Sequence, residues 1–194
     1  MGSITDRIKE LLAELPPEVI LVAATKTRSL NEIEEAIDAG IKVIGENYVQ
    51  EAESKFSAIG RTVRWHMVGH LQRNKVEKAL EIFDCIQTLD NLRLAKEINK
   101  IAGEKRIQYP VLIEINSAHE EQKSGILPEN TEELLYNISQ MPNIKVEGLM
   151  TMGPLVRNPE EIRPYFRRTK EIFERLKDLQ LQNIEMKHLS MGMS

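Results

Sequence analysis

The order of apolar and polar segments in this sequence predicts an α/β protein folded as a TIM-type (β/α)8 barrel. Short apolar runs alternate with amphipathic helical patterns along the 194 residues, an order typical of parallel strands joined by helical crossovers. Seven such strand-and-helix units can be recognised. The first apolar run is not followed by the glycine-rich turn of a dinucleotide-binding sheet, which favours a barrel over an open, doubly wound sheet.

A leading helix is expected before the barrel, at about residues 3–15. Ile4, Ile8 and Leu12 follow helical spacing there, and two prolines come directly afterwards. The first strand, residues 19–24, is continuously apolar, as is typical of a parallel strand that is covered on both faces. The barrel is therefore expected to begin at this strand.

The remaining units repeat the pattern. Ser29 and Glu32 form a capping box that starts the first crossover helix, and Pro128 starts a later one in the favoured first turn. The last helix, at about residues 159–179, is expected to bend or restart at Pro164. The further strands are expected at residues 42–44, 64–68, 84–89, 111–115, 145–150 and 185–189.

The predicted barrel is one strand short. A barrel of this type needs about eight strands, so we expect the last strand and the helix before it to be missing from residues 1–194. An interrupted barrel leaves two strand edges unpaired, which is costly in a buried parallel sheet. A hydrophobic content of 41% can supply one core, and we expect a single domain.

Composition excludes several classes of function. The net charge is −4 and the basic residues are scattered among acidic ones, so we expect no nucleic-acid partner. There is no signal-peptide pattern and no apolar run of membrane-spanning length, so we expect a cytoplasmic protein without a membrane partner. Cys85 is the only cysteine, which excludes an internal disulfide, and we expect it to be a small core residue.

Chemistry in such a barrel is expected where the strands end at their carboxyl side. Lys26 is the most informative residue there, because desolvation at the end of an apolar strand favours a neutral amine, which attacks an aldehyde to form a Schiff base. The alternative is a lysine whose stem crosses apolar surface while its head reaches water. The polar residues at these ends are Lys26, Asn47, His70, Asn116, Thr151 and Ser190.

The segment after the seventh strand, residues 190–194, offers hydroxyl groups and free backbone N–H groups that suit a phosphate. Its alternative interpretation is an ordinary Gly/Ser turn. A Schiff-base lysine and a phosphate cradle at neighbouring strand ends would together suit pyridoxal 5′-phosphate.

The other titratable residues give weaker indications. His66 and His70 share a face but have no third ligand nearby, so we do not expect a metal site. His188 is expected to pack inside the barrel. Asp84 and Glu114 are strand carboxylates without an obvious partner, and we do not assign acid–base catalysis to them.

Six blocks together resemble the pyridoxal phosphate homeostasis proteins, in the order of that family and over essentially the whole chain. Each block is weak alone, but the lysine block followed by the second and third blocks is specific as a set. They are VAATKT at 22–27, GENYVQE at 45–51, WHMVGHLQRNK at 65–75, KSG at 123–125, GLMTM at 148–152 and LSMGMS at 189–194.

The resemblance implies the barrel of the alanine racemase N-terminal domain, a type III fold among pyridoxal phosphate proteins. It implies a covalent link from the cofactor to Lys26 and a role in intracellular cofactor homeostasis and in amino-acid and keto-acid balance. Further phosphate ligands of the family would follow residue 194. The residues expected to bind the cofactor are Lys26, Asn47, Met152, Ser190, Met191, Gly192 and Ser194.

The sequence favours a protein that only holds the cofactor, rather than an enzyme that uses the cofactor to convert a substrate. Racemisation needs an acid–base group on the opposite face of the cofactor ring, and none of the four tyrosines lies in a strand-end motif suited to that role. We therefore expect a non-enzymatic monomer that can supply pyridoxal phosphate-dependent apo-enzymes. The alternatives are an amino-acid racemase or decarboxylase that uses the same cofactor, and a cofactor-free barrel in which Lys26 is inert.

Overall fold

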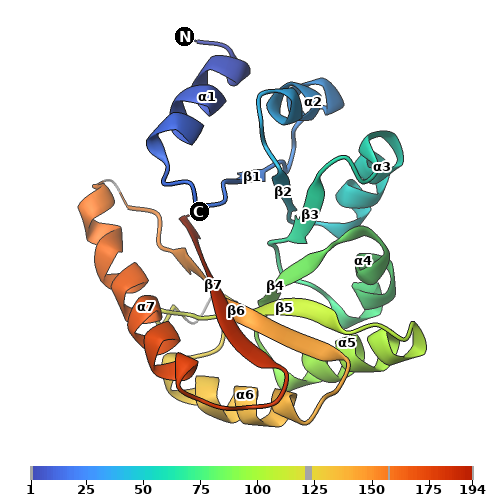
Figure 1. Ribbon diagram of the computed structural model, residues 1–194, viewed down its shortest axis with the longest axis vertical. Helices are drawn as coiled ribbons and strands as arrows, with labels where there is room; N and C mark the ends of the chain where they lie inside the picture. Colours follow the sequence, from blue (N-terminus) through green and yellow to red (C-terminus); the bar gives the residue numbers. More distant parts are fainter. Residues whose placement is uncertain (1, 121–123, 157, 194) are drawn as a thin grey trace.

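The computed structural model describes residues 2–120, 124–156 and 158–193, and its centre is one curled sheet of seven parallel strands (Figure 1). Each strand pairs with the next one along the chain, in the order β1 to β7. The strands are β1 Val22–Ala24, β2 Val43–Glu46, β3 Arg64–Met67, β4 Cys85–Leu89, β5 Tyr109–Glu114, β6 Ile144–Gly153 and β7 Ile184–Met193.

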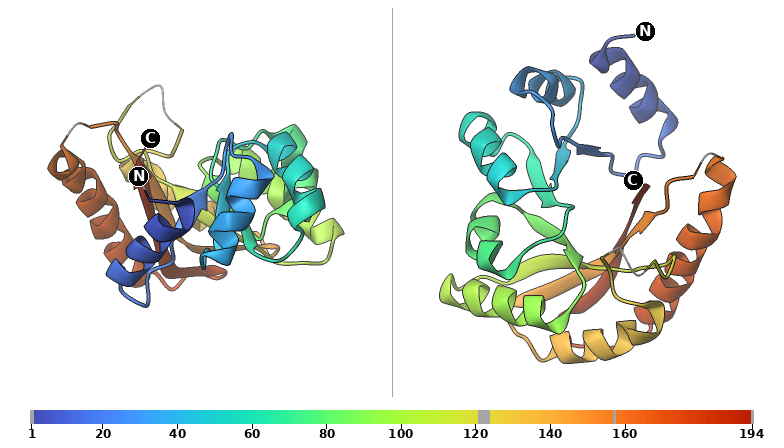
Figure 2. Two further views of the ribbon diagram at one scale, coloured as in Figure 1. Left: turned by 90° about the horizontal axis from the view of Figure 1, so that it is seen from above. Right: turned by 180° about the vertical axis from the view of Figure 1, so that it is seen from behind.

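Helices cover the outer side of the sheet, as the views of Figure 2 show. Short 3₁₀ turns at Arg73–Lys75, Pro128–Asn130 and Pro159–Ile162 lead into the fourth, sixth and seventh helices. The helices are α1 Ile4–Glu14, α2 Leu30–Asp38, α3 Val49–Ile59, α4 Val76–Ile82, α5 Leu92–Glu104, α6 Thr131–Ser139 and α7 Arg163–Lys177. The predicted (β/α) barrel is confirmed as a curled seven-stranded α/β sheet.

The sheet is open between β1 and β7, since no pairing joins these two strands within the described residues. This open side explains why β1 is shorter than predicted. The prediction of a strand from residue 19 was wrong: Val19 and Ile20 are 46% and 48% exposed, and β1 pairs with β2 only from Val22. An apolar sequence alone does not make a strand where no neighbouring strand supplies hydrogen bonds.

The last two strands run further than predicted. β6 continues to Gly153 and β7 to Met193, with Met150 opposite Ser190 and Met152 opposite Gly192. The predicted end of the seventh strand at residue 189 was therefore wrong, and the alternative interpretation of residues 190–193 as a turn is wrong as well. Residues 190–193 stay extended because β6 offers them a partner over the same length, and Ser194 lies outside the described residues.

The predicted capping box at Ser29 and the predicted restart at Pro164 are confirmed. Ser29 caps α2 and Glu32 completes the capping box, while the leading helix α1 has the same arrangement at Ser3 and Asp6. Pro164 lies in the first turn of α7, so the segment restarts there after a 3₁₀ turn. Figure 1 shows α1 beside α2, away from the remaining helices.

Trp65 is the largest side chain that is fully buried between the sheet and the helices. Its ring meets Phe56 of α3 edge to face at 5.5 Å, and its indole N–H donates to the Gly60 carbonyl at 2.9 Å. The Trp65 amide donates to the Asp84 carboxylate, which also pairs with Arg61 at 2.7 Å. Asp84 thus has partners that the sequence did not indicate, and they tie β3 to the start of β4.

Cys85 is buried beside Leu112 and Met150, as expected of a small core residue. Burial raises the pKa of its thiol to about 12, so the reactive thiolate is scarce at neutral pH. In the part of the chain that the structure describes, none of the helices combines the length and apolar character needed to cross a membrane.

Gly148 in β6 provides a test of the sheet geometry. Its φ is +148°, and a Cβ there would lie only 1.8 Å from the His188 carbonyl oxygen of β7. We expect Gly148→Ala to lower the free energy of unfolding by about 3 kcal/mol or more, because two backbones must separate. Urea denaturation of the purified variants measures this loss.

Gly60→Ala is the matched control, because Gly60 also has a positive φ, +63°, but open space around its Cβ position. With a ψ of −144°, Gly60 has a strained conformation that side chains rarely adopt, so this variant should lose about 1–3 kcal/mol from backbone strain alone. Equal losses in the two variants would contradict the close approach of β6 and β7 at Gly148.

Candidate functional site

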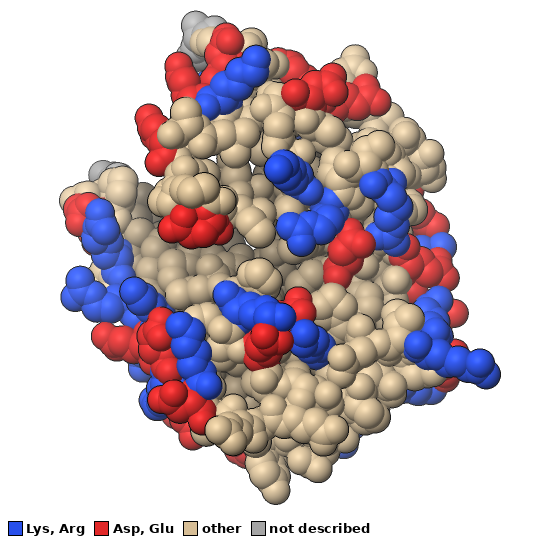
Figure 3. All heavy atoms as spheres, in the orientation of Figure 1, with Lys and Arg blue, Asp and Glu red and all other residues tan. Residues whose placement is uncertain are grey.

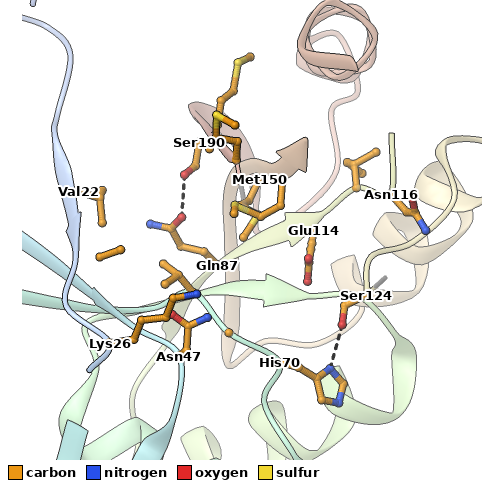
Figure 4. Close-up of a pocket in the computed structure, with 18 residues that line it drawn as sticks. Val22, Lys26, Asn47, His70, Gln87, Glu114, Asn116, Ser124, Met150 and Ser190 are labelled. Atoms are coloured by element: carbon orange, nitrogen blue, oxygen red, sulfur yellow. Dashed lines mark hydrogen bonds between the residues drawn. The ribbon is translucent and has the colours of Figure 1, made fainter. Parts of the chain in front are cut away.

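A pocket of about 540 Å³ lies at the carboxyl ends of the strands, where the barrel argument expects chemistry (Figure 4). It is formed from both ends of the chain, because β1 and β2 contribute one side and β6 and β7 another. Its polar and sulfur-containing lining consists of Lys26, Asn47, His70, Gln87, Glu114, Asn116, Ser124, Met150, Met152, Ser190, Met191 and Met193, together with Gly69 and Gly192.

The structure brings together the predicted site residues that it describes. Lys26 and Asn47 follow β1 and β2, and Met152, Ser190, Met191 and Gly192 belong to β6 and β7, yet all six line this pocket. Ser194, the remaining predicted residue, lies outside the described residues. Parallel strands in sequential order place these segments at the same edge of the sheet although they are far apart in the sequence.

Thr151 is the strand-end residue that does not reach the pocket. Its hydroxyl is buried, donates to the Ile115 carbonyl at 3.0 Å and lies 2.9 Å from the Ser117 hydroxyl. Thr151 therefore holds β6 against the end of β5, while Met150 and Met152, its neighbours on the opposite face, line the pocket.

Lys26 is exposed, in contrast to the desolvated strand-end lysine that the sequence predicted. The difference arises because β1 is an edge strand and ends at Ala24, two residues before Lys26. Its amine lies at the side of the pocket next to Asn47 and opposite Ser190 (Figure 4). A ligand entering the pocket can therefore reach this amine directly.

A buried ionic cluster that the sequence did not indicate lies behind the Lys26 turn. The Lys55 ammonium of α3 donates to Glu46 at 2.6 Å and to Glu51 at 2.7 Å. Burial acts to lower the pKa of Lys55, but its hydrogen bonds to the two carboxylates outweigh burial and raise the pKa. The i,i+4 spacing of Glu51 and Lys55 was a signal in the sequence, but the partner Glu46 lies on a different element.

A second chain of hydrogen bonds crosses the inside of the sheet. Burial, followed by the charge of Arg64, lowers the pKa of His66 to about 4, so its ring is neutral at pH 7. The neutral ring accepts from the Gln87 amide at 2.6 Å, and the Gln87 carbonyl accepts from the Ser190 hydroxyl at 2.7 Å. Gln87 thus orients Ser190, one of the predicted phosphate ligands.

The histidines lie apart from one another. His66 contacts Gln87 inside the sheet, whereas His70 lies beyond the end of β3 with its ring 3.4 Å from the Ser124 hydroxyl. His188 is exposed, so its predicted packing inside the barrel was wrong; β7 is an edge strand and no further strand covers it. Within the described residues, no group of three His, Cys, Asp or Glu side chains is placed to hold a metal ion.

Glu114 at the end of β5 points into the pocket (Figure 4) and is only 8% exposed. Burial, with a smaller contribution from the Asp90 charge, raises its pKa to about 7. None of the described side chains forms a hydrogen bond or ion pair with its carboxyl group. The sequence showed Glu114 as a strand carboxylate without a partner, but only the curled sheet places it in the same pocket as Lys26.

Charges on the face seen in Figure 3 are mixed. Lys and Arg side chains lie among Asp and Glu side chains around the rim, and no extended area of one sign is visible on this face. Several charged side chains of the described residues form exposed pairs, such as Lys78 with Glu53 and Glu81. Exposed pairs of this kind contribute little to stability.

Comparisons with known proteins agree with this geometry. Residues 1–194 match the family described as "Alanine racemase, N-terminal domain". The pyridoxal phosphate homeostasis protein of Aquifex aeolicus is 43% identical over 175 residues, which cover 90% of this chain and 76% of the relative. The protein of the same name from Haemophilus influenzae is 39% identical, over 91% of this chain and 75% of the relative.

Solved structures show the same relationship. PipY of Synechococcus elongatus, solved with PLP bound, superposes with a TM-score of 0.81 at 28% identity and covers 98% of both chains. An alanine racemase of Clostridium difficile superposes with a TM-score of 0.77 at 14% identity, over 98% of this chain and 56% of the racemase, and shows the fold alone. The chain belongs to the alanine racemase N-terminal domain family and, within it, to the pyridoxal phosphate homeostasis proteins.

Proposed function

We propose that this protein holds pyridoxal 5′-phosphate (PLP) as a Schiff base on Lys26 and serves intracellular PLP homeostasis and amino-acid and keto-acid balance, without turning over a substrate. The observation that carries the proposal is an accessible lysine at the strand ends, in one pocket with the predicted ring and phosphate ligands. It is supported by PipY, a relative whose structure contains PLP and which covers nearly the whole chain.

The pocket residues fit the three parts of the cofactor. Lys26 is the one lysine in the described lining and would bind the aldehyde, while Asn47 and Met152 would contact the ring. Ser190 with the backbone at Met191 and Gly192 would receive the phosphate. A Cβ at Gly192 would lie 3.1 Å from the Met152 sulfur, so the glycine keeps this side of the pocket free for a ligand.

We propose no turnover because the described pocket lining contains no tyrosine that could act as the second acid–base group. When bound, PLP supplies an electron sink for carbanion chemistry, and a racemase needs a proton-transfer group on each face of the ring. The four tyrosines lie outside the described pocket lining: Tyr48 and Tyr136 are more than 60% exposed, and the buried Tyr109 hydroxyl donates to the Phe83 carbonyl. The racemase of Clostridium difficile is only 14% identical.

An amino-acid racemase is the second candidate, and the carboxyl group of Glu114 is the observation that favours it. With a pKa near 7 it can hold or release a proton at physiological pH, and it lies in the same pocket as Lys26. Glu114 would then be the second group beside Lys26, on the opposite face of the ring. The relatives named pyridoxal phosphate homeostasis proteins favour a protein that only holds the cofactor, and we retain that as the proposed function.

We further propose that residues 1–194 act as one domain, that the protein is a cytoplasmic monomer, and that it passes PLP to PLP-dependent apo-enzymes. The name of the relatives, pyridoxal phosphate homeostasis protein, supports a role in the supply of PLP. The exposed position of Lys26 also supports release of the cofactor to a recipient, because the amine is reached without opening the sheet.

Lys26→Ala tests the Schiff-base assignment. The wild-type protein mixed with PLP should turn yellow and, after borohydride reduction, should carry one added pyridoxyl group on the peptide that contains Lys26. The alanine variant has no amine in the pocket and should lose both signals. Mass spectrometry of the reduced, digested protein measures the stoichiometry.

Lys187→Ala is the control, because Lys187 lies on β7 but outside the described lining of this pocket. It should retain the colour and the adduct. A reducible adduct of unchanged stoichiometry and position in Lys26→Ala would contradict the assignment.

Solvent hydrogen exchange distinguishes a protein that only holds PLP from an amino-acid racemase. In deuterium oxide, D- or L-alanine should incorporate no more deuterium at Cα with holo-protein than with free PLP at the same concentration, because the described pocket lining holds no tyrosine to act as the second proton-transfer group. Proton NMR of the amino acid measures this. Exchange that is faster with protein, and is lost in Glu114→Gln, would establish the racemase instead.

Glu114→Gln tests the charge of the pocket. The folded state raises the pKa of Glu114 from 4.5 to about 7, so this group's contribution to stability is complete below pH 4.5 and is lost as pH rises to about 7. Between these pH values the wild type should lose on the order of 3 kcal/mol more stability than the variant.

Urea denaturation at half-unit pH steps measures the difference. Glu53→Gln, a change at an exposed carboxylate of α3, should leave the wild-type profile unchanged. Parallel profiles for the wild type and Glu114→Gln would show that the Glu114 carboxyl group is not buried in the folded protein.

A further inference from the structure

We propose that Glu51 and Lys55 of α3 are positioning residues for Lys26: they anchor the peptide groups on both sides of it and hold the next residue in a strained conformation. The inference rests on the proposed function of Lys26 as the residue that binds PLP. It assigns a role to side chains that lie outside the described lining of the pocket.

Thr27, the residue after Lys26, has a φ of +62°. This left-handed conformation is uncommon for residues other than glycine and is a genuine outlier for a β-branched residue such as threonine. Without a partner the chain would relax to a negative φ and turn Lys26 away from its present direction. The surrounding structure must therefore supply the interactions that keep the turn in place.

The interactions come from α3. The Thr27 amide donates to a Glu51 carboxylate oxygen at 2.6 Å, and the Thr25 carbonyl accepts from the Lys55 ammonium at 2.7 Å. These two groups belong to the peptide units on either side of the Lys26 Cα. Because the orientation of those two units defines φ and ψ of Lys26, the two contacts fix the direction in which its side chain leaves the backbone.

Lys55 is itself fixed in place. Its ammonium has three protons, and the three acceptors are the Thr25 carbonyl, Glu46 and Glu51. Glu46 is fully buried and also accepts from the Thr25 hydroxyl at 2.7 Å. The Thr25 amide in turn donates to the Gly45 carbonyl of β2 at 2.9 Å, so the turn is attached to both the sheet and α3.

Positioning explains this cluster better than stability does. Burying the Lys55 ammonium and the Glu46 carboxylate has a large desolvation cost, while the Glu51 side chain stays 26% exposed. Apolar residues in place of a buried ion pair often stabilise a fold as well or better. What apolar residues cannot provide is a charged acceptor for the Thr27 amide and a charged donor for the Thr25 carbonyl. The cluster therefore defines the backbone geometry at Lys26, although burying its charges lowers the stability of the fold.

Glu51→Ala is the test, because it removes the acceptor of the Thr27 amide and leaves the pair of Lys55 with Glu46. In the apo-protein the Thr27 amide should lose its hydrogen-exchange protection, measured by NMR. With PLP added, the rate of borohydride-trapped adduct formation at Lys26 should fall by about tenfold, since a misplaced reacting group slows a reaction strongly.

Two further variants separate positioning from a general loss of structure. Glu51→Gln keeps an acceptor oxygen and should stay within about threefold of the wild-type rate, since a neutral hydrogen bond is about half as strong as a charge-assisted one. Adding Thr27→Gly to Glu51→Ala should recover at least half of the lost rate on a logarithmic scale, because glycine adopts a positive φ without strain. A purely structural role of Glu51 would not predict this recovery.

Glu53→Ala is the matched control on the same helix, where Glu53 pairs with Lys78 on the solvent side. It should change neither the Thr27 exchange nor the adduct rate. The inference is overturned if Glu51→Ala matches the wild type in both measurements, if Glu53→Ala slows the adduct equally, or if Thr27→Gly gives no recovery. Absence of a Lys26 adduct in the wild type would overturn the proposed function instead, while the apo-protein exchange still decides whether Glu51 holds the turn.

Discussion

The parallel pairing of consecutive strands is the constraint on which the site depends. Because every strand runs in the same direction, their carboxyl ends meet at one edge of the sheet, and the curl of the sheet turns that edge into a pocket. Lys26 and Ser190 are 164 positions apart in the chain, yet they line the same cavity. No contact between them is needed; the ladder from β1 to β7 places both.

The pairing fixes where the strands end but not how the chain leaves them. β1 is a short edge strand, so its ladder stops at Ala24 and cannot orient Lys26. Beyond Ala24, side chains of α3 form the hydrogen bonds that hold the backbone: Lys55 donates to the Thr25 carbonyl, and Glu51 accepts from the Thr27 amide. The shortest strand of the described sheet thus leads to the lysine that we propose binds PLP, and side chains of the neighbouring helix hold the backbone beyond the strand.

The features predictable from the sequence were those with local causes. The capping box at Ser29, the restart at Pro164 and the apolar strand periodicity depend on neighbours within a few residues. The extension of β7 was not predictable, because it depends on β6 running equally far. The exposure of Val19 was not predictable either, because it depends on the unpaired edge of the sheet at β1. Glu114, Gln87 and the cluster around Lys55 were missed for the same reason: their partners come from other elements.

The hydrogen bond that the Ser190 hydroxyl already makes limits how strongly Ser190 could bind a phosphate in the pocket. The neutral His66 ring takes one proton of the Gln87 amide group, so the Gln87 carbonyl oxygen faces Ser190 and takes its only hydroxyl proton. A phosphate at Ser190 needs that same proton. The hydroxyl must then leave Gln87, whose buried carbonyl would lose its partner at a cost of about 1–3 kcal/mol. In the proposed phosphate site, Ser190 would therefore contribute only the surplus over this loss, and a charge-assisted bond to a phosphate would be strong enough to provide one.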